Sequence, residues 1–186
     1  MRPQKVDTET LLMGALSVLK EKGFDGASLN ELAKATGLQK ASLYHRFPGG
    51  KEEIAQNVFC FIEEWILNKL VKILNDPAVS PEKRLSRVLK NIDSLYQGGK
   101  DVCFIRSLSM GTGKQLFSDD IQKVLHIWIK AFYEFGLGIG FNNEKAQETA
   151  EHSLMIIQGS LVLSNAMDEP KHFKNALIQV KENYFS

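Results

Sequence analysis

Apolar residues recur every three or four positions along almost the whole of this sequence. Ile54, Val58 and Ile62 are one example, and this spacing places apolar side chains on one face of an α-helix. Gly, Pro, Asn and Ser separate the periodic segments, and these residue types are typical of the breaks between helices. We therefore expect an all-α protein.

The breaks predict nine helices. Asp7 or Thr8 opens the first helix and Gly23 stops it. Ser28 and Glu31 have the spacing of a capping box, in which each side chain accepts a hydrogen bond from the other residue's backbone N–H group. The expected helices span approximately residues 8–23, 28–36, 39–47, 51–75, 80–97, 102–110, 118–135, 144–166 and 170–184.

Charge is distributed unevenly along the chain. Its 186 residues carry a formal net charge of +1, so the whole protein has no strong attraction to nucleic acid or membrane. Residues 1–51 nevertheless hold eight Lys and Arg against five Asp and Glu, whereas residues 52–186 hold fifteen against seventeen. The basic excess therefore lies in the amino-terminal quarter, as expected if that part meets phosphates.

Residues 28–51 predict a helix-turn-helix. A short capped helix is followed by a tight turn at Thr36-Gly37-Leu38, where Gly37 permits the sharp change of direction, and then by a second short helix. Leu43 and Phe47 anchor that second helix, which leaves a polar face outward. Lys and Gln side chains can reach base edges, while hydroxyl, imidazole and guanidinium groups can hold phosphates. The second helix is therefore a candidate for insertion into a major groove.

This stretch resembles the signature of the TetR/AcrR family of repressors. The similarity covers about residues 8–58 and rests on Ala-Thr-Gly-Leu-Gln-Lys-Ala-Ser-Leu-Tyr-His-Arg-Phe at 35–47, followed by Lys-Glu-Glu-Ile at 51–54. The resemblance implies a homodimer with a DNA-binding head at residues 1–50 and an effector-binding and dimerisation body at residues 51–186. It further implies that the fourth helix bridges the two parts and that the last two helices form the dimer.

The resemblance also assigns DNA contacts, residue by residue. It matches Ser28, Tyr44, His45 and Lys51 to residues that contact phosphates, and Gln39, Lys40 and Ser42 to residues that face bases. Two positions depart from the commoner pattern. The turn at Pro48-Gly49-Gly50 is one residue longer, and Gln39 replaces a small residue at the start of the second helix.

Two further sites are expected in the body. Aromatic and apolar residues on several helices would enclose a cavity for an apolar or flat aromatic effector, although each of them is also an ordinary candidate for the core. These residues are Phe61, Trp65, Phe104, Leu108, Met110, Phe117, Trp128 and Phe132. Small residues along the eighth helix would let a partner helix approach closely. The expected dimer interface is Gly159, Ser160, Leu163 and Ser164.

Other functions find little support in the sequence. His126, His152 and His172 lack a second metal ligand three or four residues away, and the glycines at 136–140 follow a helix rather than a strand, so we expect neither a metal nor a dinucleotide cofactor. No catalytic triad can be assembled, and we expect no enzyme. Cys60 and Cys103 are expected to be small core residues. No stretch approaches the roughly 20 apolar residues of a membrane span, so we expect a cytoplasmic protein.

The sequence thus predicts a ligand-responsive transcriptional regulator, in particular a repressor, that binds a palindromic operator as a dimer and is released by a small effector. The alternative is a helical protein that binds small molecules or other proteins and does not use DNA. A salt-sensitive, sequence-specific complex with DNA would distinguish the two.

Overall fold

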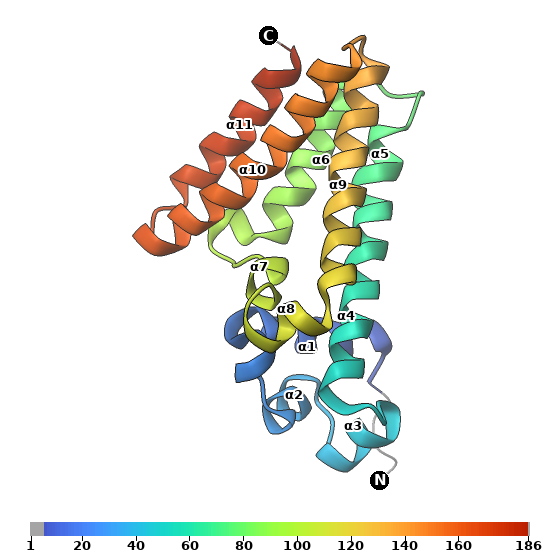
Figure 1. Ribbon diagram of the computed structural model, residues 1–186, viewed down its shortest axis with the longest axis vertical. Coiled ribbons are helices and arrows are strands. Elements are labelled where there is room, and N and C mark those ends of the chain that lie inside the picture. Colours follow the sequence, from blue (N-terminus) through green and yellow to red (C-terminus); the bar gives the residue numbers. More distant parts are fainter. Residues whose placement is uncertain (1–5, 186) are drawn as a thin grey trace. The chain divides into compact units, whose positions relative to one another are not determined.

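The computed structural model describes residues 6–185, and all regular structure in this range is helical (Figure 1). The predicted all-α class is confirmed. All nine predicted helices are present, with one further short helix, α8. The elements are α1 (Thr8–Gly26), α2 (Leu29–Ala35), α3 (Lys40–Arg46), α4 (Gly50–Ile66), η1 (Leu67–Val71), α5 (Lys72–Leu74), α6 (Pro81–Leu95), η2 (Gln97–Gly99), α7 (Phe104–Leu108), α8 (Gly111–Leu116), α9 (Ser118–Gly138), α10 (Asn143–Met167) and α11 (Lys171–Phe185).

The chain divides into two compact units. The first, here called the head unit, comprises the residues up to Glu63 together with Phe104–Gln122. The second, the body unit, comprises Glu64–Cys103 and Lys123–Ser186. The division of function predicted at residue 50 stays a prediction. The compact unit that contains the expected DNA-binding helices extends beyond residue 50 to Glu63 and also includes the downstream segment Phe104–Gln122.

Helix α1 forms the centre of the head unit. Asp7 caps its amino terminus by accepting a hydrogen bond from the backbone N–H of Thr10 at 2.9 Å. Its buried face packs against α2, α7 and α8. This face consists of Leu11, Leu12, Ala15, Leu16 and Leu19. Near its end, Gly23 adopts a positive φ of 65°, so α1 continues beyond the predicted stop through a kink to Gly26.

The downstream segment Phe104–Phe117 is fastened to the end of α1. The Ser107 hydroxyl donates a hydrogen bond to the Lys20 carbonyl at 2.7 Å. The Asp25 carboxylate accepts one from the backbone N–H of Thr112 at 2.9 Å, which caps the short α8 from outside its own sequence. The Phe117 ring meets the Phe24 ring edge-on, with 5.2 Å between centroids. Backbone and side-chain groups of α1 thus hold α7 and α8 in place.

A continuous helix runs through α4, η1 and α5, with a π-helical turn at η1. A π turn takes in one more residue than an α-helical turn, so it changes which later residues face the core. Ile66, Leu70 and Leu74 are all fully buried, whereas Ile73, which an uninterrupted α-helix predicts to lie in the core, is half-buried. In the body unit, Asn91 of α6 donates a hydrogen bond to the Lys69 carbonyl in this turn at 3.0 Å.

Helices α10 and α11 lie side by side in the body unit (Figure 1). Asp168, with a positive φ of 53°, ends α10 and turns the chain back toward α11. The buried Ser164 hydroxyl accepts a hydrogen bond from the Phe173 backbone N–H at 3.0 Å, and the Tyr184 hydroxyl donates one to the Phe132 carbonyl at 3.1 Å. These bonds fix both ends of the helix pair.

The prediction that both cysteines are core residues is half right. Cys103 is buried, but Cys60 is exposed. Its neighbours Val58, Phe59 and Ile62 occupy the buried face of α4, and Cys60 falls on the other side of the helix. Among the described residues, no helix is long and apolar enough to cross a membrane.

Candidate DNA-binding surface

Helix α2 begins with the predicted capping box. The Glu31 backbone N–H donates to the Ser28 hydroxyl oxygen at 3.2 Å, and the Glu31 carboxylate accepts from the Ser28 backbone N–H at 3.1 Å. Lys22 forms an ion pair with Glu31. The hydrogen bond from Lys22, followed by those from Ser28, lowers the pKa of Glu31 to about 2. The Glu31 carboxylate therefore stays ionised, and it holds the start of α2 to the end of α1.

The turn between α2 and α3 is a Schellman motif. Gly37 has a positive φ of 69°, which glycine adopts without steric cost. The Leu38 backbone N–H donates to the Ala33 carbonyl at 3.0 Å, and the Gly37 N–H donates to the Lys34 carbonyl at 3.3 Å. Both carbonyls would otherwise lack partners at the end of α2. The motif sets the direction in which the chain enters α3.

Helix α3 presents the polar face predicted for DNA recognition. Leu43 is only 1% exposed and anchors the helix, whereas Tyr44 is 44% exposed. All the other predicted contact residues on this helix and at its start are also exposed: Gln39, Lys40, Ser42 and His45. Gln39 is the N-cap residue and its side chain makes no capping hydrogen bond, so the amide remains available. The surface combines hydrogen-bonding groups with the Lys40 charge.

Two basic residues at the edge of this surface are used inside the head unit. Arg46 donates hydrogen bonds to the Val6 carbonyl at 3.1 Å and to the Thr8 hydroxyl at 2.6 Å, which ties α3 to the start of α1. The Lys51 ammonium donates to the Phe24 carbonyl at 2.7 Å and lies 4.4 Å from the centroid of the Phe24 ring. A phosphate at Lys51 would have to share its ammonium with these groups. The sequence predicted neither role, because the groups that Arg46 and Lys51 bind are 27 to 40 residues away along the chain.

The start of α4 has an acidic cap. The Glu53 carboxylate accepts a hydrogen bond from the Gly49 backbone N–H at 2.7 Å. Glu52 and Glu53 both lie in the first turn, next to Lys51. The negative charge satisfies the positive end of the helix dipole within the protein. Ser28 is exposed at the start of α2, but its hydroxyl donates a hydrogen bond to the Glu31 carboxylate at 2.7 Å, so a phosphate there would have to compete with Glu31.

The residues predicted to form an effector pocket fall in both units. Phe61, Phe104, Leu108, Met110 and Phe117 belong to the head unit, and Trp65, Trp128 and Phe132 to the body unit. Within the head unit, Phe104 and Phe117 pack against Phe59 with ring centroids 4.9 and 5.5 Å apart, as core residues do. Met110 is 61% exposed. The assignment of these eight residues to a pocket stays a prediction.

Two cavities in the body unit are lined by other residues. One has a volume of about 340 Å³ and lies between α9 and α10. Its lining is mainly apolar and consists of Leu125, Ile129, Glu151, Leu154, Met155 and Gln158. The other lies between α10 and α11 and is lined by polar and charged residues. Sequence spacing gave no signal for either cavity, because each depends on how two helices pack.

The four predicted dimer residues divide between two faces of α10. Gly159 is exposed, and no atom lies within 4 Å of the position of an added Cβ. Leu163 is 50% exposed. Ser160 and Ser164 instead face the protein interior, where Ser160 donates to the Ile157 carbonyl at 2.8 Å and Ser164 accepts from Phe173. Only Gly159 and Leu163 are therefore available to a partner in this structure.

Helices α2 and α3 and the turn between them form a helix-turn-helix. Residues 11–58 match the model of the family described as bacterial regulatory proteins, tetR family. The chain is 24% identical over 160 residues to the HTH-type transcriptional regulator LmrA of Bacillus subtilis, covering 84% of this chain and 85% of LmrA. It is 30% identical over 89 residues to the negative regulator of the biofilm operon icaADBC, IcaR, of Staphylococcus aureus, covering 48% and 41% of the two chains.

Solved structures agree with this assignment at the level of the fold. A TetR transcriptional regulator from Legionella pneumophila has a TM-score of 0.82 and 18% identity, covering 99% of this chain and 100% of that one. A cysteine mutant of the TetR-family regulator CifR, complexed with a 26-bp double-strand operator DNA, has a TM-score of 0.74 and 19% identity, covering 97% and 98%. Residues 11–58 thus resemble the tetR family of regulators, and the described residues share the fold of TetR structures.

Proposed function

We propose that this protein acts as a repressor, which binds a palindromic operator as a homodimer and leaves it when a small effector binds. The observation that carries the proposal is the exposed polar face of α3 (Lys40–Arg46), anchored by the buried Leu43 and directed by the Schellman motif before it. A repressor role is supported by IcaR, which is named a negative transcriptional regulator. Operator binding is supported by the CifR complex. As a DNA-binding regulator, the protein would act in the cytoplasm.

In the proposed complex, residues at the start of α3 face the bases. Gln39, Lys40 and Ser42 lie in the first turn of α3 or directly before it, and a helix in a major groove reads bases mainly with its first turns. Ser28, Tyr44, His45 and Lys51 would contact phosphates. Two such surfaces in a dimer would occupy major grooves roughly 34–36 Å apart, or a multiple of that distance.

An exposed apolar stripe along α10 supports dimerisation through this helix. Gly159 lies four residues after Met155, Val162 and Leu163 lie three and four residues after Gly159, and all four residues are exposed. An apolar stripe of this kind is typical of a surface that a partner covers. In a twofold dimer the same stripe of both chains would meet, with Gly159 permitting close approach of the two helices.

Effector release follows from the different affinities of two conformations. An effector that binds the body preferentially in a conformation with altered spacing of the two heads weakens operator binding, and DNA then weakens effector binding by the same factor. The buried Trp128 indole supports an apolar or aromatic effector with one acceptor, because its N–H has no hydrogen-bond partner among the described residues. Such an effector would supply the missing acceptor.

The test is to select DNA fragments with the purified full chain and to measure binding of the selected site at several salt concentrations. We expect a palindromic site and a binding constant that falls steeply as salt increases. In Tyr44→Ala, affinity should fall for all sequences and the salt dependence should weaken by about one phosphate contact. In Lys40→Ala, the preference at one base position should relax, with a cost of roughly 1–3 kcal/mol.

The alternative function, a helical binding protein that does not use DNA, makes the opposite prediction. Selection would then return no enriched sequence, and a folded Tyr44→Ala dimer would bind DNA as weakly as the unaltered protein. Glu134→Gln is a suitable control variant, because Glu134 lies in the body unit and pairs only with Lys130 at 3.7 Å on the surface. It should leave the operator affinity unchanged.

A further inference from the structure

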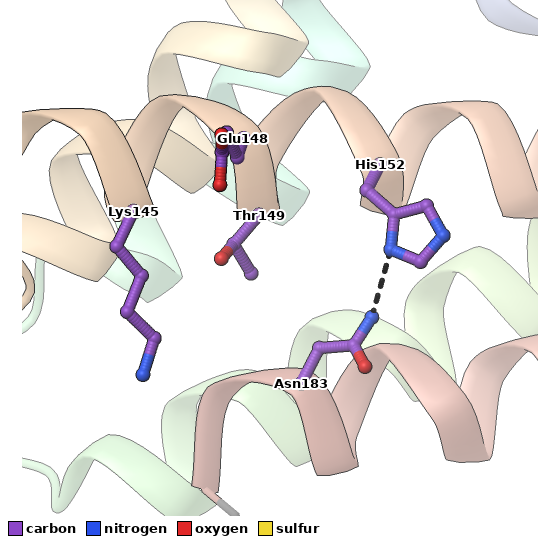
Figure 2. Close-up of a pocket in the computed structure, with 5 residues that line it drawn as sticks. All are labelled: Lys145, Glu148, Thr149, His152 and Asn183. Atoms are coloured by element: carbon purple, nitrogen blue, oxygen red, sulfur yellow. Dashed lines mark hydrogen bonds between the residues drawn. The ribbon is translucent and has the colours of Figure 1, made fainter.

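A polar cavity in the body unit has no place in the proposed DNA-binding function. It lies between α10 and α11, has a volume of about 490 Å³, and is lined by Lys145, Glu148, Thr149, His152 and Asn183 (Figure 2). None of these residues was predicted to belong to a site. Pockets that bind small molecules generally measure roughly 300–1,000 Å³. The cavity therefore has room for a small ligand.

Thr149 contributes a hydroxyl group that is accessible from the cavity. Its side chain points into the space between the two helices (Figure 2), and the residue is only 9% exposed. Within residues 6–185 the hydroxyl has no hydrogen-bond partner, and it is not among the polar atoms that are shut off from solvent. The hydroxyl is therefore free to donate a hydrogen bond to a ligand in the cavity.

Other lining groups are held in position by the protein itself. Gln179 donates a hydrogen bond to the Asn183 amide oxygen at 3.1 Å, and the Asn183 amide nitrogen lies 3.2 Å from Nδ1 of His152 (Figure 2). The Lys145 ammonium lies 4.0 Å from the centroid of the Phe141 ring. A wall fixed in this way loses little side-chain freedom when a ligand binds.

The lining carries one charge of each sign. Lys145 and Glu148 both face the cavity, and no ion pair joins them or links either to another described residue. A carboxylate would match the Lys145 ammonium and the Thr149 hydroxyl, which are four residues apart on one face of α10. An ammonium group would match Glu148. A ligand with both groups pairs with both side chains. A simple anion would be repelled by the Glu148 carboxylate, and a simple cation would be repelled by the Lys145 ammonium.

We propose that this cavity binds a small zwitterion that carries a carboxylate and an ammonium group, as a free amino acid does. The proposal goes beyond the regulator function and does not depend on DNA binding. The first half of α10 lines the cavity, whereas the residues of the proposed dimer stripe lie further along the helix. The volume beyond the two charged groups accommodates an amino-acid side chain.

Isothermal titration of the full chain without DNA tests the proposal with two sets of matched probes. The first set is L-phenylalanine, 3-phenylpropanoate, which lacks the ammonium group, and 2-phenylethylamine, which lacks the carboxylate. The second is L-alanine, propanoate and ethylamine. We expect at least one amino acid to bind saturably and its two partial analogues to bind roughly tenfold more weakly or worse. Equal binding of the amino acid and its carboxylate analogue, or no binding by either amino acid, would overturn the proposal.

Two variants connect that binding to this cavity. Thr149→Val removes the hydroxyl group at nearly constant shape and should weaken amino-acid binding roughly tenfold. Lys145→Gln should abolish the advantage of the amino acid over its amine analogue. Lys130→Gln, on the exposed surface of α9, is the matched control and should bind as the unaltered protein does. Circular dichroism confirms that each variant is folded. Unchanged affinity in folded Thr149→Val and Lys145→Gln would place the binding elsewhere and refute the site, whatever the protein does with DNA.

Discussion

Glu31 shows how a single side chain can serve two helices at once. Its carboxylate closes the capping box with Ser28 at the start of α2 and pairs with Lys22 near the end of α1. The sequence predicted the capping box because its two members are three residues apart. It did not predict the ion pair, because Lys22 is nine residues away and becomes a neighbour only after the chain turns between the helices.

The ionisation of Glu31 should make the stability of the head depend on pH. Its pKa is about 2 in the folded chain against an ordinary value of 4.5. A lowered pKa contributes stability that is fully present above about pH 4.5 and is lost as the pH falls toward about 2. Urea unfolding of the unaltered protein and of Glu31→Gln should therefore differ most near neutral pH, and the difference should shrink on acidification from about pH 5 to pH 3.

The control for this measurement is Glu134→Gln, whose pair with Lys130 is exposed on α9 and contributes little. Its stability difference from the unaltered protein should be small throughout the same pH range. A Glu31→Gln difference that stayed constant down to pH 3 would contradict the role assigned to the ionised carboxylate.

The residues expected to contact DNA illustrate what one sequence can and cannot predict about a site. The outward positions of Gln39, Lys40, Ser42, Tyr44 and His45 follow from the helical period around the buried Leu43, and the structure places all of them at the surface. The bonds of Arg46 to Val6 and Thr8 do not follow from any local pattern. Long-range contacts of this kind depend on how helices pack.

At the scale of elements, the short helix α8 was the principal omission. Gly111-Thr112-Gly113 has the composition of a loop, because glycine disfavours helices. The helix forms because Asp25, 87 residues earlier in the chain, caps it through Thr112. Gly113 also fits a close approach, since an added Cβ would lie 2.8 Å from the Leu108 carbonyl oxygen. Tertiary contacts here outweigh local preference.

The close packing of α1 against α2 predicts that a larger residue at Gly14 destabilises the protein. A Cβ added at Gly14 of α1 would lie 2.3 Å from the Ala35 carbonyl oxygen and 2.8 Å from its carbon, and these backbone atoms cannot easily move. Gly14→Ala should therefore lower the free energy of unfolding by about 1–3 kcal/mol. Helix propensity alone predicts the opposite, a gain of about 1 kcal/mol.

Chemical denaturation of Gly14→Ala measures this difference, and Gly138→Ala is its control. Gly138 lies at the end of α9, where no atom is within 4 Å of an added Cβ. The control should change the stability by about 0.5 kcal/mol or less. If Gly14→Ala were as stable as the unaltered protein, α1 and α2 would have to be further apart than the structure places them.

At the scale of the whole molecule, the proposed dimer can be tested without DNA. Leu163→Lys places a charge in the apolar stripe of α10, and burying that charge against the same residue of the partner chain would be costly. We expect the variant to run as a monomer in light-scattering chromatography and to lose most of its operator affinity, because one chain engages only one half-site.

Leu116→Lys makes the same chemical change at another exposed leucine. Leu116 is 43% exposed, against 50% for Leu163, but it belongs to the head unit rather than to α10. This control should keep the mass of the unaltered protein. If Leu163→Lys remained a dimer, the interface would have to lie elsewhere than on this stripe.

The π-helical turn at Leu67–Val71 has a consequence for comparing this chain with its relatives. A turn that takes in an extra residue offsets everything after it by one position relative to an uninterrupted α-helix. An alignment drawn without a gap against a relative whose corresponding helix is α-helical throughout would therefore equate buried positions with exposed ones on one side of residues 67–71. A single-residue gap placed in this turn restores the correspondence between the two interiors.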